Sequence, residues 1–165
     1  MKVVECREGE PMCNDKSSDL DGLFCFFNGT FFPKVLLRLP LSIIKKELLT
    51  EINVAHAQLH PNSWAFIWGF IILCSQLDIS LTIEVFLYFI ELKYSSHQLW
   101  VSLNDASRRG LLTLFQSSYK NFKNRFIKVC ASAGDLSLLD GFPLYWTPNP
   151  WFYSARRLED LSPRD

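Results

Sequence analysis

A chain of 165 residues is long enough for one domain with a substantial core, and its 48% apolar content is ordinary for a globular protein. Aromatic residues are abundant at 15%, and Phe alone occurs 14 times, which excludes a disordered chain, a collagen and a coiled coil. Seventeen basic residues balance 17 acidic ones, and this zero net charge argues against a strongly basic nucleic-acid-binding protein.

The two ends of the chain differ in character from its centre. Residues 1–21 are polar and acidic, which predicts a flexible leader, and a Phe-rich segment follows. Ser162 and Pro163 signal the start of a helix, yet the sequence ends three residues after Ser162, so we expect a truncated tail and poor packing after about residue 158. The sequence therefore predicts three parts: a leader with a Phe-rich segment at residues 1–31, a domain at residues 32–161 and a tail at residues 162–165.

No targeting or membrane-spanning segment is predicted. The N-terminus lacks the apolar region of a signal peptide, and the longest apolar run, residues 64–74, is too short to cross a bilayer. The five cysteines are widely spaced and form no C-x-x-C motif, which gives neither a zinc motif nor a disulfide framework. We therefore expect an intracellular protein, in the nucleus or the cytoplasm, that is neither secreted nor transmembrane.

The first predicted helix begins after Ser42, whose hydroxyl is suited to cap the first turn. Ile44, Leu48 and Ile52 follow at helical spacing and form its apolar face, with Lys45 on another face. These positions predict a short amphipathic helix.

The second predicted helix covers residues 63–77 and follows Pro61, with Asn62 or Ser63 as its N-cap. Its apolar run is continuous, so most of its faces should be buried. Gly69 lies in its middle, where glycine costs about 1 kcal/mol relative to alanine unless it permits a close helix crossing.

Residues 80–92 fit two patterns. Their aromatic and β-branched content favours a strand. Glu84, Tyr88 and Glu91, however, form a polar stripe at helical spacing, and Thr82 can cap a helix that starts there. We predict a helix for this segment.

The second half of the chain predicts strands separated by polar turns. The first two strands are expected to pair as a hairpin, and a short helix at residues 117–123 is expected before the third. The four predicted strands are residues 99–103, 111–115, 125–130 and 142–147. The predicted architecture is α+β, with N-terminal helices followed by a small, mostly antiparallel sheet of about four strands.

Short motifs occur along the chain in a fixed order, at residues 39–42, 48–55, 58–66, 85–89, 100–103, 118–123 and 142–146. Two of them are specific: the Leu-His-Pro-Asn-Ser-Trp run at residues 59–64 and the Phe-Pro-Leu-Tyr-Trp run at residues 142–146. The series resembles the plant domain called gypsy-type transposon or gypsy-type transposase, which occurs near the N-terminus of reading frames carried by plant retroelements. The resemblance covers about residues 32–161. It implies a retroelement origin, and it assigns no catalytic residue because the activity of the family is undefined.

The residues themselves predict no catalytic, cofactor-binding or metal site. Transposases need three converging carboxylates, and the acids of the chain do not follow the pattern of such a core. A retroelement protease needs an Asp-Thr/Ser-Gly turn, which is absent. His56 and His60 have the spacing of a helical metal site, but they flank a connector closed by Pro61, so we expect His60 to cap or pack against the next helix instead. We therefore predict a module that is not an enzyme.

Residues 106–134 contain no acid and six bases, which are Arg108, Arg109, Lys120, Lys123, Arg125 and Lys128. Within this basic stretch, aromatic residues alternate with the bases, and two interpretations stay open. In one, the bases contact phosphates and exposed rings stack on nucleic-acid bases. In the other, the rings face the core and the lysines face water, which is favoured because Tyr119, Phe122 and Phe126 share one helical face.

Three hypotheses for function follow. The first is a non-enzymatic structural or interaction domain that acts in self-assembly or nucleic-acid packaging. The second is a weak nucleic-acid-binding module that uses the basic stretch. The third, an enzyme of transposition, depends on the resemblance alone. The expected partners are nucleic acid, bound weakly, and a second copy of the chain, and we expect no membrane, cofactor or small-molecule substrate.

Overall fold

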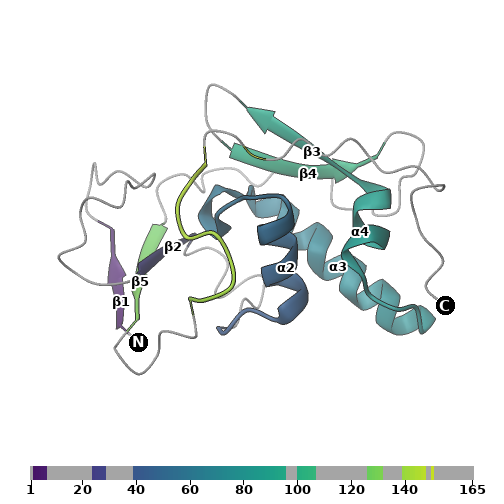
Figure 1. The fold of residues 1–165 in the computed structure, drawn as a ribbon, viewed down its shortest axis with the longest axis horizontal. Helices are drawn as coiled ribbons and strands as arrows, with labels where there is room; N and C mark the ends of the chain where they lie inside the picture. Colours follow the sequence, from purple (N-terminus) through teal and green to yellow (C-terminus); the bar gives the residue numbers. More distant parts are fainter. Residues whose placement is uncertain are drawn as a thin grey trace.

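The computed structural model describes residues 2–6, 24–28, 39–95, 100–106, 126–131, 139–147 and 150. In this part of the chain, three α-helices combine with two antiparallel sheets, so the fold is α+β, as predicted (Figure 1). The predicted order and strand count are wrong. Two strands precede the helices, and separate sheets of three and two strands take the place of one sheet of about four. The physical reason is that residues 2–5 and 24–28 pair with residues 126–130, about a hundred positions away, where local patterns carry no information on pairing.

The three-stranded sheet has the order β1-β5-β2, and its outer strands both run antiparallel to the central one. Strand β1 is Lys2–Glu5, β2 is Phe24–Asn28 and β5 is Phe126–Cys130. Strand β5 was predicted from its alternating pattern. Strands β1 and β2 both lie within residues 1–31, the segment predicted as a leader that precedes the domain.

Strand β2 is packed on both of its faces. On one face, Cys25 and Phe27 lie opposite Val129 and Ile127 and join the main core. On the other face, Phe26 belongs to a second, smaller aromatic cluster. Burial on both faces explains the continuous run of apolar residues in β2.

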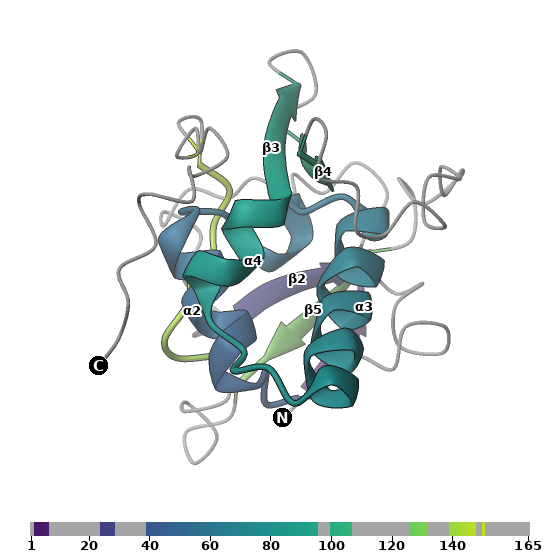
Figure 2. The ribbon, with the colours of Figure 1, turned by 90° about the vertical axis from the view of Figure 1, so that its right-hand side faces the viewer.

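The helices lie on one side of this sheet (Figure 2). Helix α2 is Ile43–Glu51, helix α3 is Pro61–Leu77 and helix α4 is Ile83–Phe89, and a short 3₁₀ turn η2, His56–Gln58, precedes α3. Both helices predicted from apolar spacing are confirmed. Ser42 occupies the N-cap of α2, and its backbone carbonyl accepts hydrogen bonds from the following turn, but its hydroxyl makes no capping hydrogen bond.

Helix α3 begins two residues earlier than predicted, because its N-cap is His60 rather than Asn62 or Ser63. The Nδ1 atom of His60 accepts a hydrogen bond from the backbone N–H of Asn62 at 3.2 Å. Pro61 occupies the first turn, where its missing N–H needs no partner. The capping role expected for His60 is confirmed. The helix ends at Asp78, which adopts the left-handed conformation that aspartate tolerates.

The ambiguous segment at residues 80–92 contains a helix and the start of a strand. Thr82 caps α4, as predicted, since its Oγ1 accepts a hydrogen bond from the N–H of Val85 at 3.2 Å. The chain then enters β3, Ile90–Ser95, which pairs antiparallel with β4, Trp100–Asp105. The strand-forming composition therefore belongs to the second half of the segment.

The fourth predicted strand, residues 142–147, is wrong, because this segment is irregular. Phe142 of this segment and Leu139 just before it are both buried in the main core. The predicted strand at 111–115, the helix at 117–123 and the truncated tail at 162–165 lie outside the described residues.

One main core joins the helices to both sheets. Its largest fully buried side chains include Trp64 from α3, Leu49 from α2, Leu87 from α4, Leu103 from β4 and Phe27 from β2. The three helices and the strands β2 and β4 therefore each contribute at least one large side chain to a shared interior.

Candidate functional site

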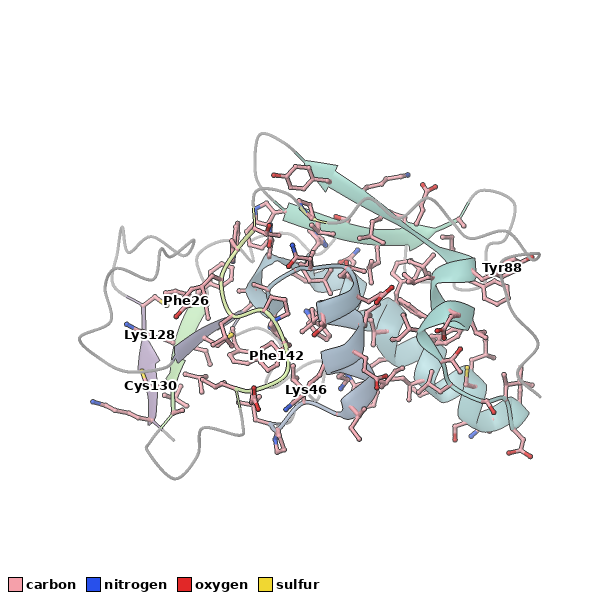
Figure 3. All side chains as sticks on the ribbon, viewed as in Figure 1. Phe26, Lys46, Tyr88, Lys128, Cys130 and Phe142 are labelled. Atoms are coloured by element: carbon pink, nitrogen blue, oxygen red, sulfur yellow. The ribbon has the colours of Figure 1, made fainter. Side chains whose placement is uncertain are left out.

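The structure describes one of the six basic residues that are candidates for contact with nucleic acid. Lys128 lies on β5, opposite Val4 on one side and Phe26 on the other, and its side chain is half-buried (Figure 3). The other five lie outside the described residues, and they are Arg108, Arg109, Lys120, Lys123 and Arg125.

Lys128 shares its sheet face with an aromatic cluster. The ring of Trp100 stacks on Phe126 with the centroids 5.8 Å apart, and it meets Trp146 edge-on at 4.7 Å. Trp100 and Phe126 are both buried, so their faces cover one another. The burial of Phe126 agrees with the second interpretation of the basic stretch, in which its aromatic rings face the core and its lysines face water.

A buried histidine is the feature that sequence reasoning missed. His56 is fully buried, and its ring lies 4.2 Å from the ring of Trp64 in a stacked arrangement and 4.3 Å from that of Phe27. Burial lowers the pKa of His56 well below its usual range, and the positive charge of Lys45 lowers it further. The apolar run around residue 56 was the one signal that could have indicated this burial.

Lys45 lies on the buried side of α2. The prediction that it lies on a face away from the apolar one is therefore wrong. Its ammonium group sits over the ring of Trp68, with Nζ 4.1 Å from the ring centroid. Burial lowers the pKa of the amine. The long aliphatic stem fills an apolar position while the charged end rests on an aromatic face, which is why the sequence pattern misleads here.

The residues that flank the two specific motif runs, Gln58 and Thr147, meet in the folded chain. The side-chain amide of Gln58 donates from Nε2 to the carbonyl of Thr147 at 2.7 Å, and its Oε1 accepts from the N–H of Thr147 at 3.1 Å. We call this pair of hydrogen bonds the Gln58 clasp. Thr50 adds a hydrogen bond from Oγ1 to the carbonyl of Gly141 at 3.2 Å. Residues 139–147 are thereby fastened to η2 and α2.

The first motif run also fastens α3 to β4. Ser63 is fully buried, and its Oγ accepts a hydrogen bond from the N–H of Leu103 at 2.9 Å. The N–H of His60 donates to the carbonyl of Val101 at 2.7 Å, beside a parallel bridge between Leu59 and Val101. Ser63 and His60 therefore both form hydrogen bonds to backbone groups of β4.

The carboxylates of the described residues lie mostly at the surface. Glu47, Glu51, Asp78 and Asp140 are exposed, and Glu91 forms an ion pair with a neighbouring lysine. In this part of the chain, no three His, Cys, Asp or Glu side chains gather in a way that could hold a metal ion. Among the same residues, no helix has both the length and the apolar character to cross a membrane.

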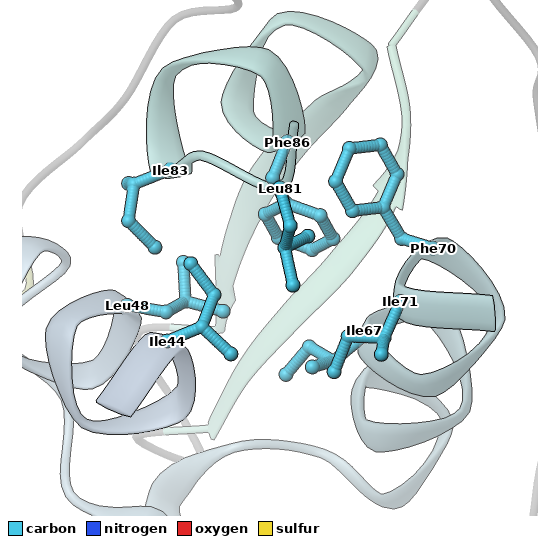
Figure 4. A pocket seen from close by; sticks show the side chains of 8 residues that line it. All are labelled: Ile44, Leu48, Ile67, Phe70, Ile71, Leu81, Ile83 and Phe86. Atoms are coloured by element: carbon cyan, nitrogen blue, oxygen red, sulfur yellow. The ribbon is translucent and has the colours of Figure 1, made fainter. Parts of the chain in front are cut away.

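A small apolar cavity of about 10 Å³ lies between the three helices (Figure 4). This volume is comparable with the space that one water molecule needs. The side chains that line it are Ile44, Leu48, Ile67, Phe70, Ile71, Leu81, Ile83 and Phe86.

Comparison with known proteins gives one match. Residues 27–94 match the model of the family described as "Putative gypsy type transposon". This segment is similar to the gypsy-type transposon family. The match confirms the resemblance over the last two residues of β2, the helices and most of β3, including the motif run at residues 59–64, and it covers less than half of the chain. The run at residues 142–146 lies beyond it. No curated protein and no solved structure matches the chain.

Proposed function

We propose that this chain is a retroelement-derived, non-enzymatic structural or interaction module of the gypsy-type transposon family. The observation that carries the proposal is the use made of the motif side chains. Gln58 holds the backbone of Thr147, His60 caps α3, Ser63 holds the backbone of β4 and Trp64 stacks in the core.

Each of these polar groups satisfies a backbone partner within the same chain. A buried backbone group without a partner costs about 1–3 kcal/mol, so side chains that satisfy several of them stabilise the arrangement of the helices and β4. The hydrogen bonds within the chain therefore explain why these motif positions hold a glutamine, a histidine and a serine. A catalytic role is not needed to explain them.

A cleavage assay tests the proposal. The full chain is incubated with linear and supercoiled DNA in the presence of Mg²⁺ or Mn²⁺, and we expect neither strand cleavage nor strand transfer. Asp78→Asn and Asp140→Asn change two exposed acids and serve as matched variants. Metal-dependent cleavage that either variant abolishes would overturn the proposal.

Weak nucleic-acid binding through residues 106–134 is the second candidate. It is supported by the composition of this stretch, which contains six bases and no acid, while the rings beside Lys128 are buried and take no part in it. Fluorescence anisotropy with DNA and RNA oligonucleotides should then show weak binding that falls steeply with salt. Lys128→Gln should reduce the slope of log binding constant against log salt concentration by about one. Lys93→Gln, at an exposed lysine on the other sheet, should leave the slope unchanged. Absence of binding at low salt would refute this candidate.

A further inference from the structure

The short turn η2 joins several parts of the molecule, because each of its three residues is buried against a different neighbour. His56 lies between the rings of Phe27 and Trp64, which belong to the main core. Ala57 belongs to the second, aromatic cluster. Gln58 forms the Gln58 clasp. A movement of His56 therefore also moves the two residues that follow it.

The surroundings of His56 do not accommodate a positive charge. Its ring is fully buried, and the ammonium group of Lys45 on α2 opposes a second positive charge. The thiol of Cys25 on β2, whose pKa is raised by burial, and His60 before α3, whose pKa is lowered by burial, are both uncharged at pH 7. Asp140 is exposed to solvent. A proton on His56 is therefore an uncompensated buried charge, which is costly unless the ring reaches water.

The connector that contains η2 can move outward while the helices on both sides stay folded. Before it, Asn53 has a φ of 50°, a left-handed conformation that asparagine tolerates and that ends the path of α2. After it, the N–H of His60 holds the carbonyl of Val101 in β4 at 2.7 Å. Between these two points, the hydrogen bond from the N–H of Leu59 to the carbonyl of His56 is long, at 3.4 Å. The turn therefore lies between two fixed ends and is itself weakly closed.

The segment at residues 143–147 depends on η2 for its position. It forms no helix or strand, and Gln58 holds both backbone groups of Thr147. Trp146 packs against the aromatic cluster to which Ala57 belongs. Just before this segment, the carbonyl of Gly141 is held by Thr50 instead. Loss of η2 from the interior therefore removes support from residues 143–147 and leaves the contact at Gly141 in place.

We propose that η2 is a proton-sensitive switch: when His56 takes up a proton in mild acid, η2 leaves the core, the Gln58 clasp opens and residues 143–147 are released, while the helices and β4 stay in place. This inference rests on the proposed function, in which the motif side chains are structural links, and it adds the proton as the regulator of one link.

The pH range of the switch follows from the protonation of His56. The opened turn exposes the ring, which then binds a proton with an ordinary pKa near 6.5, whereas burial and Lys45 keep the closed turn from binding it. Opening therefore becomes about tenfold more favourable for each pH unit below 6.5, down to the pKa of the closed turn. Above pH 6.5 both states are neutral and the opening equilibrium is constant.

Hydrogen exchange of the full chain, followed by NMR between about pH 7.5 and about pH 5, tests the switch. The protection factor is the intrinsic exchange rate divided by the observed rate. For the amide of Thr147 it should be lower than for that of Leu103, should fall about tenfold from pH 6.5 to about pH 5.5, and should not change in dilute urea, which marks a local opening. In His56→Phe, or in His56→Leu if the first variant does not fold, it should stay constant with pH.

His60→Asn is the matched control, because asparagine can cap α3 but does not titrate, and this variant should keep the pH dependence of the wild type. A protection factor of Thr147 that is constant with pH in the wild type would overturn the inference, and so would one equal to that of Leu103, since the segment would then open only with the whole fold. Both results come from the wild type alone. They leave the proposed function intact, whereas metal-dependent cleavage would overturn the proposed function and leave these exchange data unaffected.

Discussion

Mild acid is expected to destabilise this protein through His56, whose ring is fully buried between Phe27 and Trp64. Burial is the largest cause that lowers its pKa well below 6.5, and the charge of Lys45 adds to it. The unfolded chain therefore binds a proton near pH 6.5 that the folded chain does not bind. Since the unfolded state holds more protons below this pH, the free energy of unfolding falls as the pH falls.

The loss amounts to about 1.4 kcal/mol for each pH unit, from pH 6.5 down to the pKa of His56 in the folded chain. Above pH 6.5 the imidazole is neutral in both states, and the contribution to the pH dependence disappears. A domain is typically stable by about 5–15 kcal/mol, so two pH units remove a large share of this margin.

Urea unfolding followed by tryptophan fluorescence measures the effect in the wild type and in His56→Phe. The variant keeps a ring against Trp64 but cannot bind a proton. Between about pH 7.5 and about pH 5, the stability of the wild type should fall relative to that of the variant. Any contribution of His60, whose pKa is also lowered by burial, cancels in this difference because both proteins contain it. A constant difference across this pH range would refute the reasoning.

Three further substitutions test individual contacts by urea unfolding. Ser63→Ala removes the acceptor of the buried Leu103 N–H and should cost about 1–3 kcal/mol, and an unchanged midpoint would contradict this role. Thr82→Ala should cost about 0.5–2 kcal/mol through loss of the α4 cap, whereas Thr82→Ser should retain most of the stability, and equal losses would contradict the cap. Lys45→Met removes the second cause that lowers the pKa of His56, so it should narrow the pH interval over which stability is lost; an unchanged interval would show that Lys45 has no influence.

Local sequence patterns predicted those elements whose formation depends on neighbouring residues. Apolar spacing located α2 and α3, alternation located β4 and β5, and the hydroxyl of Thr82 marked the start of α4. The α+β class followed from these elements. Strand pairing did not follow, because β5 takes its partners from residues 2–5 and 24–28, about a hundred positions away.

Two predictions made from local sequence, the strand at residues 142–147 and the face of Lys45, were wrong for different physical reasons. Residues 142–147 alternate like a strand, but the backbone of Thr147 finds its partner in the side chain of Gln58 rather than in another strand. Lys45 was placed on a polar face because its charge outweighed its long apolar stem, and the aromatic face of Trp68 that receives the charge lies on a different helix. Both outcomes depend on contacts between segments that the sequence separates.

The candidate site was predictable to a smaller extent. Lys128 was correctly placed on a strand, and Phe126 packs in the aromatic cluster with Trp100. The burial of His56 was not predicted, since a histidine in a connector carries no periodic signal. Its surroundings come from α3 and β2, which converge only in the folded chain.

Hydrogen exchange at the amide of Thr147 tests most directly the central claim that the motif side chains hold the fold together. The Gln58 clasp predicts that this amide is protected in the wild type and that Gln58→Ala increases its exchange rate by at least about tenfold. The amide of Leu103, which is held by Ser63, should stay protected in the same variant. Equal exchange of Thr147 in the two proteins would contradict the claim.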